Sequence, residues 1–138
     1  MSANSLWDVQ VGVFNRLSGD AGLTTLLASG AEGIFDHAPP AAQLPYVVLG
    51  ELSLREMDTH RGAGANISLA VHVYSKEGGL KEAKQIMGKV YEALHNASFV
   101  VPNYDLILCQ FVDAEVRLEG DGATRHGVQR FQVVVEPV

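Results

Sequence analysis

The chain has 138 residues, of which 47% are hydrophobic, and its formal net charge is −6 at pH 7. This length fits one domain with a substantial core, and this composition excludes a disordered chain. The excess of acidic residues disfavours non-specific binding to nucleic acid, because that binding depends mainly on lysine and arginine.

Two short helices are predicted at the start of the chain. Residues 5–17 place apolar side chains at helical spacing, and Ser5 is the expected N-cap. Asp20 is expected to begin a second helix, which buries three leucines and ends near Gly30. The first residues lack the pattern of a secretory signal, and no apolar run approaches the ~20 residues that span a bilayer. We therefore expect a cytoplasmic origin and no membrane partner.

The middle of the chain predicts an antiparallel pair of strands. An apolar pair, Ile34 and Phe35, precedes a proline-containing segment that excludes regular structure. The first strand is expected over residues 46–56 and the second over residues 67–74. In the first, Tyr46, Val48, Gly50, Leu52 and Leu54 alternate with Val47, Leu49, Glu51, Ser53 and Arg55. In the second, Ile67, Leu69, Val71 and Val73 alternate with Ser68, Ala70, His72 and Tyr74. Residues 57–66 are predicted as a polar, glycine-containing loop.

A longer helix and two further strands are predicted in the second half. The KEGG segment at 76–79 should break the preceding strand, and a helix is expected over residues 80–95. Its apolar stripe consists of Leu80, Ala83, Ile86, Met87, Val90 and Leu94. Strands are expected over residues 106–118 and 128–136, and Phe131, Val133 and Val135 form the buried face of the last one.

These elements predict one α+β domain over residues 1–138. Strands joined by short loops favour a mainly antiparallel sheet. The long helix is a crossover that packs on one face of this sheet, with the short N-terminal helices beside it. The result is a two-layer architecture.

Enzyme motifs are missing from the sequence. The histidines form no HExxH pattern and no i, i+4 pair on one helix, which disfavours a zinc site. The GAGAN segment at 62–66 lacks the phosphate-loop pattern and precedes a strand instead of a helix. No GxSxG motif is present, and the single cysteine, Cys109, is interpreted as a buried hydrophobic residue. We therefore predict no catalytic residue, no metal and no cofactor.

Polar residues concentrate in two connections between predicted strands. These candidate contact residues are Asp58, Thr59, His60 and Arg61 in the first connection, and Asp121, Thr124, Arg125 and His126 in the second. Loops on a rigid sheet commonly carry binding residues, so we interpret both as contact surfaces for neighbouring subunits. Arg61 is expected to meet a carboxylate across such an interface, and the glycines should let the loop order on assembly. The alternative is that both connections are idle and solvated.

Several segments together resemble the tail-completion, or tail-terminator, family of long-tailed bacteriophages and phage-derived gene transfer particles. They are the IFDHAPP segment at 34–40, LPYVVLGE at 44–51, the long run from residue 67 to 94, and DGATRHGVQRFQVVVE at 121–136. The resemblance covers nearly the whole chain. Its most distinctive part is the passage from VHVYSKEGG into the following helix.

The resemblance implies a structural role in particle assembly. Family members form a ring, commonly a hexamer, at the head-proximal end of the tail tube. The ring stops tube polymerisation and offers a face to the head connector, while DNA passes through its centre. The implied partners are further copies of the chain, the major tail tube protein and the head connector or neck proteins. The implied location is the bacterial cytoplasm during assembly and then the tail-neck region of the particle.

Other functions compete with the tail terminator. A neck or head-closure protein of the same particle would bind the connector instead of the tube. A small cytoplasmic enzyme would use His60, Arg61 and distant acidic residues, and a ligand-binding α+β module would need a deep polar pocket. Gene order beside a tail tube gene and the native mass distinguish these alternatives.

Overall fold

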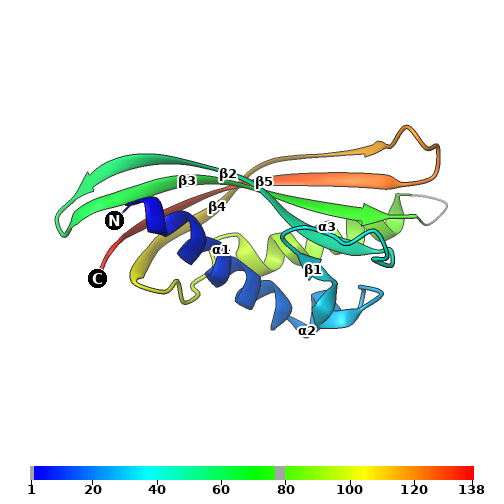
Figure 1. Ribbon diagram of the computed structural model, residues 1–138, viewed down its shortest axis with the longest axis horizontal. Helices are drawn as coiled ribbons and strands as arrows, with labels where there is room; N and C mark the ends of the chain where they lie inside the picture. The colour runs from blue at the N-terminus through cyan, green and yellow to red at the C-terminus, as the bar shows by residue number, and fades with distance from the viewer. Residues whose placement is uncertain (1, 77–79) are drawn as a thin grey trace.

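The computed structural model describes residues 2–76 and 80–138 as a two-layer α+β structure. In chain order its elements are α1 (Ser2–Ser18), α2 (Ala21–Thr24), the 3-10 helix η1 (Gly30–Gly33), β1 (Ile34–Phe35), β2 (Tyr46–Thr59), β3 (Gly62–Ser75), α3 (Lys81–Leu94), β4 (Tyr104–Leu118) and β5 (Arg125–Pro137). Figure 1 shows an elongated sheet as one layer and the helices gathered on one of its faces, so the predicted fold class is confirmed.

The sheet has the strand order β1-β2-β3-β5-β4, with β1 parallel to β2 and all other pairs antiparallel. Strands β3 and β4 therefore run parallel with β5 between them, and α3 is the crossover helix that joins them. β1 covers only Val47 and Val48 of its neighbour. Most of β2 and the whole outer side of β4 consequently form the two edges of the sheet.

The first helix buries part of its predicted stripe and begins earlier than predicted. Val9, Val13 and Leu17 are fully buried against the sheet, whereas Phe14 is 38% exposed. Ser5 lies inside the helix and is buried, so its predicted role as N-cap is wrong. Asp20 caps α2 as predicted, because its carboxylate accepts a hydrogen bond from the Leu23 amide at 3.1 Å.

The N-terminal elements end differently from the prediction. Helix α2 ends at Thr24 and does not extend to Gly30. Gly30 has a φ of +59° and begins η1. This 3-10 turn leads directly into β1, the short strand formed by the predicted apolar pair.

A β-bulge in β2 changes which side chains face the helices. Leu49 pairs with Val71 and Leu52 with Leu69, so two residues of β2 lie opposite Ala70 alone. Val47 and Leu49 are buried before the bulge, and Leu52 and Leu54 pack against the core after it. The prediction of one unbroken alternation is therefore wrong, because the extra residue shifts the side-chain phase by one.

The other predicted apolar patterns form the core. Ile67, Leu69, Val71 and Val73 of β3 and Phe131, Val133 and Val135 of β5 are at most 1% exposed. They pack against α3, whose Ile86, Val90 and Leu94 are fully buried. Leu80 does not belong to this stripe, because it precedes the helix and is 38% exposed. The predicted strand break falls mainly on residues 77–79, which lie outside the described residues.

Candidate subunit-contact surfaces

The eight candidate contact residues lie at opposite ends of the sheet. Figure 1 shows the β2–β3 turn at the end where both chain termini lie, and the β4–β5 turn at the far end. The fold brings Asp58, Thr59, His60 and Arg61 together at the first end. It brings Asp121, Thr124, Arg125 and His126 together at the second. The molecule therefore presents two different surfaces that are separated by the length of the sheet.

The predicted loop at residues 57–66 is a β-hairpin. Pairing between β2 and β3 continues to Thr59 and Gly62, so only His60 and Arg61 form the turn. Gly62 follows with a φ of +117°, a conformation that favours glycine. The prediction of a loop over residues 57–66 is wrong, because most of these residues pair between the two strands. Asp58 and His60 are exposed at the tip.

Thr59 and Arg61 stabilise this end from within the chain. The Thr59 hydroxyl donates to the Gly62 carbonyl at 2.7 Å and accepts from the Arg61 amide at 3.2 Å. Arg61 Nη1 lies 2.6 Å from Asp105, and its Nε lies 2.9 Å from Glu136. Hydrogen bonds to Glu136 and then Asp105 raise the pKa of Arg61. Arg61 therefore has two carboxylate partners in its own chain, and the contact across a subunit interface stays a prediction.

Asp121 organises the β4–β5 turn at the opposite end. Its Oδ1 accepts from the amides of Ala123 at 2.9 Å and Thr124 at 2.8 Å, and its Oδ2 accepts from the Thr124 hydroxyl at 2.6 Å. The Thr124 hydroxyl and these amides lower the pKa of Asp121 to about 2. Asp121 and Thr124 therefore act on each other and close the turn, as short polar residues often do.

His126 is not an exposed loop residue. It lies on β5, which already begins at Arg125, and it is 6% exposed. Its ring stacks on Tyr74 with the centroids 4.4 Å apart, and its Nδ1 lies 2.5 Å from Glu119. The predicted position in a loop is wrong for both Arg125 and His126, because pairing with β3 and β4 extends the strand through them.

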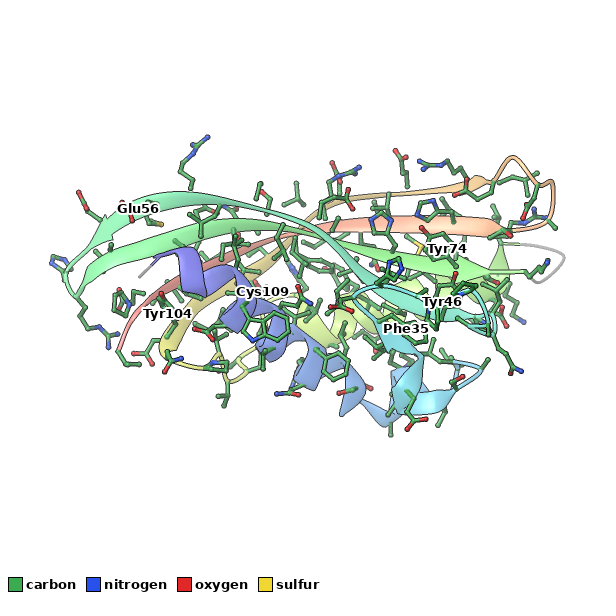
Figure 2. The ribbon with its side chains drawn as sticks, in the orientation of Figure 1. Phe35, Tyr46, Glu56, Tyr74, Tyr104 and Cys109 are labelled. Carbon is green, nitrogen blue, oxygen red and sulfur yellow. The ribbon has the colours of Figure 1, made fainter. Side chains whose placement is uncertain are left out.

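A row of aromatic rings on the sheet was not identified from the sequence. Phe35 contacts Tyr46 at a centroid distance of 5.6 Å, Tyr46 contacts Tyr74 at 5.3 Å, and Tyr74 stacks on His126. Figure 2 shows the three labelled rings following one another across β1, β2 and β3. The alternation of β3 places Tyr74 away from the helices, but only strand pairing shows which rings lie beside it.

An apolar groove lies between α1 and the adjoining edge of the sheet. Its volume is about 370 Å³, and it is lined by Trp7, Gln10, Val11, Phe14, Ile34, Phe35, Asp36 and Leu49. Trp7 is 62% exposed, which is unusual for so large an apolar side chain. The sequence analysis did not identify this groove. The signal for it in the sequence is a tryptophan in the first predicted helix, next to the apolar stripe.

The edge strand β4 also exposes apolar side chains. Ile107 and Val112 are 50% and 58% exposed, and each lies at an irregularity in the pairing with β5. A long strand edge with apolar side chains is a surface on which another chain can pair. The groove and the β4 edge lie on opposite sides of the sheet, because β1 and β4 are its outermost strands.

The described residues offer little to metal or nucleophilic chemistry. They contain no group of three His, Cys, Asp or Glu residues that could hold a metal ion. Cys109 is fully buried, as predicted, and burial raises the pKa of its thiol to about 12. Such a thiol is unreactive near neutral pH, since the thiolate is the nucleophile. No helix in this part of the chain is long and apolar enough to cross a membrane.

Comparisons with known proteins identify a family and a relative that are similar to this chain. The model of the family described as tail completion protein gp17 matches residues 11–136. The tail completion protein gp17 of Bacillus phage SPP1 is 31% identical over 93 residues, which cover 66% of this chain and 67% of that protein.

Solved structures agree with this match. A chain from the virion of a native gene transfer agent particle superposes with a TM-score of 0.86 at 26% identity, covering 98% of this chain and 99% of that one. The structure of bacteriophage SPP1 gp17 superposes with a TM-score of 0.63 at 21% identity, covering 98% and 93% respectively. The second likeness concerns the fold alone.

Proposed function

Because this chain belongs to the tail completion protein gp17 family, we propose that it forms a ring of identical subunits at the head-proximal end of a tail. The ring, a hexamer by analogy with the family it resembles, stops growth of the tail tube and joins the tail to the head. The observation that carries this proposal is the match over nearly the entire chain to a component of a gene transfer agent virion.

A closed ring requires two different surfaces on each subunit, because each copy contacts the next in a head-to-tail manner. The elongated sheet supplies such a pair. One side has the open edge of β2 and the groove beside Trp7, and the other has the edge of β4 with Ile107 and Val112. Apolar side chains and unpaired strand edges are suited to stable contacts between subunits.

The candidate contact residues take two roles in this proposal. Asp58 and His60, exposed at the β2–β3 tip, contact a neighbouring subunit or the tube directly. Thr59, Arg61, Asp121, Thr124, Arg125 and His126 keep the two ends of the sheet in the shape that the neighbours recognise. This division follows from the hydrogen bonds that already occupy Thr59, Arg61, Asp121 and Thr124 within the chain.

The partners follow from the position of the ring. The chain contacts further copies of itself through two surfaces. It also contacts the major tail tube protein and the head connector or neck proteins, and the whole chain acts as one domain. DNA passes through the centre, where a subunit with a net charge of −6 holds phosphates weakly. The role requires no catalytic group, cofactor or membrane. The protein assembles in the bacterial cytoplasm and then stays at the tail neck.

Electron microscopy of particles made without this protein tests the proposal. We expect overlong tails and heads that carry no tail, and both defects should disappear when the protein is supplied in trans. Tails of normal length that fail to join heads would instead favour a neck or head-closure protein. Normal particles with tails of normal length would overturn the proposal.

A further inference from the structure

Four ionisable side chains form a row of hydrogen-bond contacts across the sheet, from β2 to the end of β4. His72 of β3 lies at its centre, with Nε2 2.7 Å from Glu51 of β2 and Nδ1 2.7 Å from Nε2 of His126 on β5. His126 Nδ1 then lies 2.5 Å from Glu119, the residue that follows β4. Every ring nitrogen of the two histidines therefore has a partner at hydrogen-bond distance.

The number of protons that these four side chains share follows from the three contacts between them. Each carboxylate only accepts, so Glu51 and Glu119 each require an N–H from the ring they face. The contact between His72 and His126 requires a third N–H. Two neutral imidazoles carry only two such protons. One of the two rings must therefore be an imidazolium, and the pair carries a single positive charge.

Burial disfavours the extra proton on His126. The His126 side chain is only 7% exposed, and burial lowers the pKa of His126 despite the opposing effect of Glu119. The His72 side chain is 15% exposed and faces Glu51, which is 77% exposed. His126 is thus the ring that stays neutral, with its proton on Nδ1.

The nearby arginines bind other carboxylates, so Glu51 and Glu119 remain the partners of the two histidines. Arg117 Nη2 of β4 lies 3.3 Å from His126 Nδ1, and Arg117 Nη1 binds Glu115 at 2.8 Å. Because arginine can only donate, the two contacts of Nδ1 compete, and the shorter one, 2.5 Å to Glu119, places a proton on Nδ1. Arg130 of β5 binds Asp113 at 3.0 Å. Two tyrosines, Tyr46 and Tyr74, complete the surroundings, and burial and then Glu119 raise the pKa of Tyr74, which stays neutral.

The local backbone is shaped for this contact. The bulge in β2 inserts an extra residue where Glu51 meets His72. A Cβ built on the neighbouring Gly50 would lie 2.5 Å from two ring atoms of His72. Only glycine at this position leaves room for the imidazole over strand β2. The bulge and Gly50 together therefore allow His72 to reach Glu51.

We propose that His72 and His126 bind one proton between them and act as a pH-sensitive clasp that joins the β4–β5 end of the sheet to strand β2. With two extra protons, both central nitrogens carry hydrogens and repel each other across the gap. With none, two lone pairs face each other there. The clasp is therefore closed only in the state with one extra proton. This property belongs to the folded chain and does not depend on ring formation.

The sign of the acid effect follows from His126. Its folded-state pKa lies below its ordinary value of 6.5. As pH falls below about 6.5, His126 becomes protonated in the unfolded chain before it becomes protonated in the folded chain. The contribution of neutral His126 to stability is therefore present above that pH and is lost on acidification towards its lower folded-state pKa.

Nitrogen-15 NMR of the histidine rings tests the proposal directly in the wild-type protein. In the state with one extra proton we expect Nδ1 alone to be protonated in His126, and a scalar coupling between the two central nitrogens. Two rings that titrate independently, or no coupling between the central nitrogens at any pH from 5 to 8, would overturn it.

A second measurement uses variants and the unfolding midpoint in urea between pH 5 and 8. We expect the midpoint of the wild type and of the matched control His60→Gln, at the exposed hairpin tip, to fall on acidification below pH 6.5. His126→Gln should lose most of this dependence. Equal dependence in all three proteins contradicts the clasp. If His126→Gln fails to fold, the ring spectra of the wild type still decide.

Discussion

Arg61 holds the tip of the β2–β3 hairpin against the C-terminal part of β5 and the start of β4. Its two carboxylate partners, Asp105 and Glu136, are 44 and 75 residues away along the chain. Arg61 and Asp105 are each 47% exposed at their side chains. Water and salt therefore weaken the ion pairs, and their main effect is to fix the direction of the hairpin tip.

Replacing Arg61 tests this interpretation. Arg61→Ala should lower the urea midpoint slightly in dilute buffer, and the difference from wild type should nearly vanish in about 1 M salt, where the screening length is about 3 Å. Arg55→Ala, at an exposed arginine on strand β2, is the control. A large loss that persists in high salt would show that Arg61 contributes through packing instead of charge.

The turn formed by Asp121 predicts a second, more acidic dependence. The folded-state pKa of Asp121 is about 2, below its ordinary value of 3.8. Its contribution to stability is therefore fully present above about 3.8 and is lost as pH falls towards 2. Unfolding midpoints of Asp121→Ala should approach those of the wild type on acidification through this window. A gap that stays constant down to pH 2 would exclude the carboxylate as the cause.

Among the elements, α3 shows most directly how a sequence pattern becomes packing. Its buried side chains meet the apolar faces of β3 and β5, as the helical spacing predicts. Leu80, at the start of the same pattern, stays largely outside because the helix begins only after it. Two aliphatic residues of one predicted stripe therefore differ in their surroundings.

This difference should appear in measured stability. Ile86→Ala should reduce the free energy of unfolding by roughly 2–5 kcal/mol, because it leaves a cavity under the sheet. Leu80→Ala should change it by about 0.5 kcal/mol or less, the usual range for surface positions. Chemical denaturation of both variants checks the pair. Similar losses in both would mean that Leu80 is packed as tightly as Ile86.

Considered as a whole, the molecule is a long sheet with one face covered by helices and with two unlike edges. The groove beside Trp7 adjoins one edge, and exposed aliphatic side chains lie along the other. Such an arrangement suits head-to-tail contacts between copies, since each side differs from its counterpart.

A lysine on the β4 edge should therefore separate assembly from folding. Val112 is 58% exposed on the edge, and Val100 is 83% exposed in the preceding connection. Val112→Lys should fold normally but fail to limit tail length, because a charged side chain on a strand edge opposes pairing with another chain. Val100→Lys should fold and limit tail length. Electron microscopy of tails made with each variant compares them, and equal activity would argue against the β4 edge as a contact.

The tail-completion family, the α+β class and the principal core were predicted from the sequence alone. They depend on local patterns: a helical stripe at Ile86, Val90 and Leu94 of α3, and apolar residues at every second position from Ile67 to Val73 and from Phe131 to Val135. The resemblance was carried by the order of these elements over nearly the whole chain. For these features, neighbouring residues contain enough information.

Features that depend on distant partners were decided only by the tertiary structure. Residues 57–59 and 62–64 have loop-like composition, yet they extend the strands because each pairs with the other strand across the turn. The bulge at Gly50 and Glu51 brings Gly50 so close to His72 of the neighbouring strand that a Cβ would meet its ring. His72 and His126 are 54 residues apart and meet because β3 pairs with β5. Side-chain chemistry can be read along the chain, but which groups share a hydrogen bond depends on strand register.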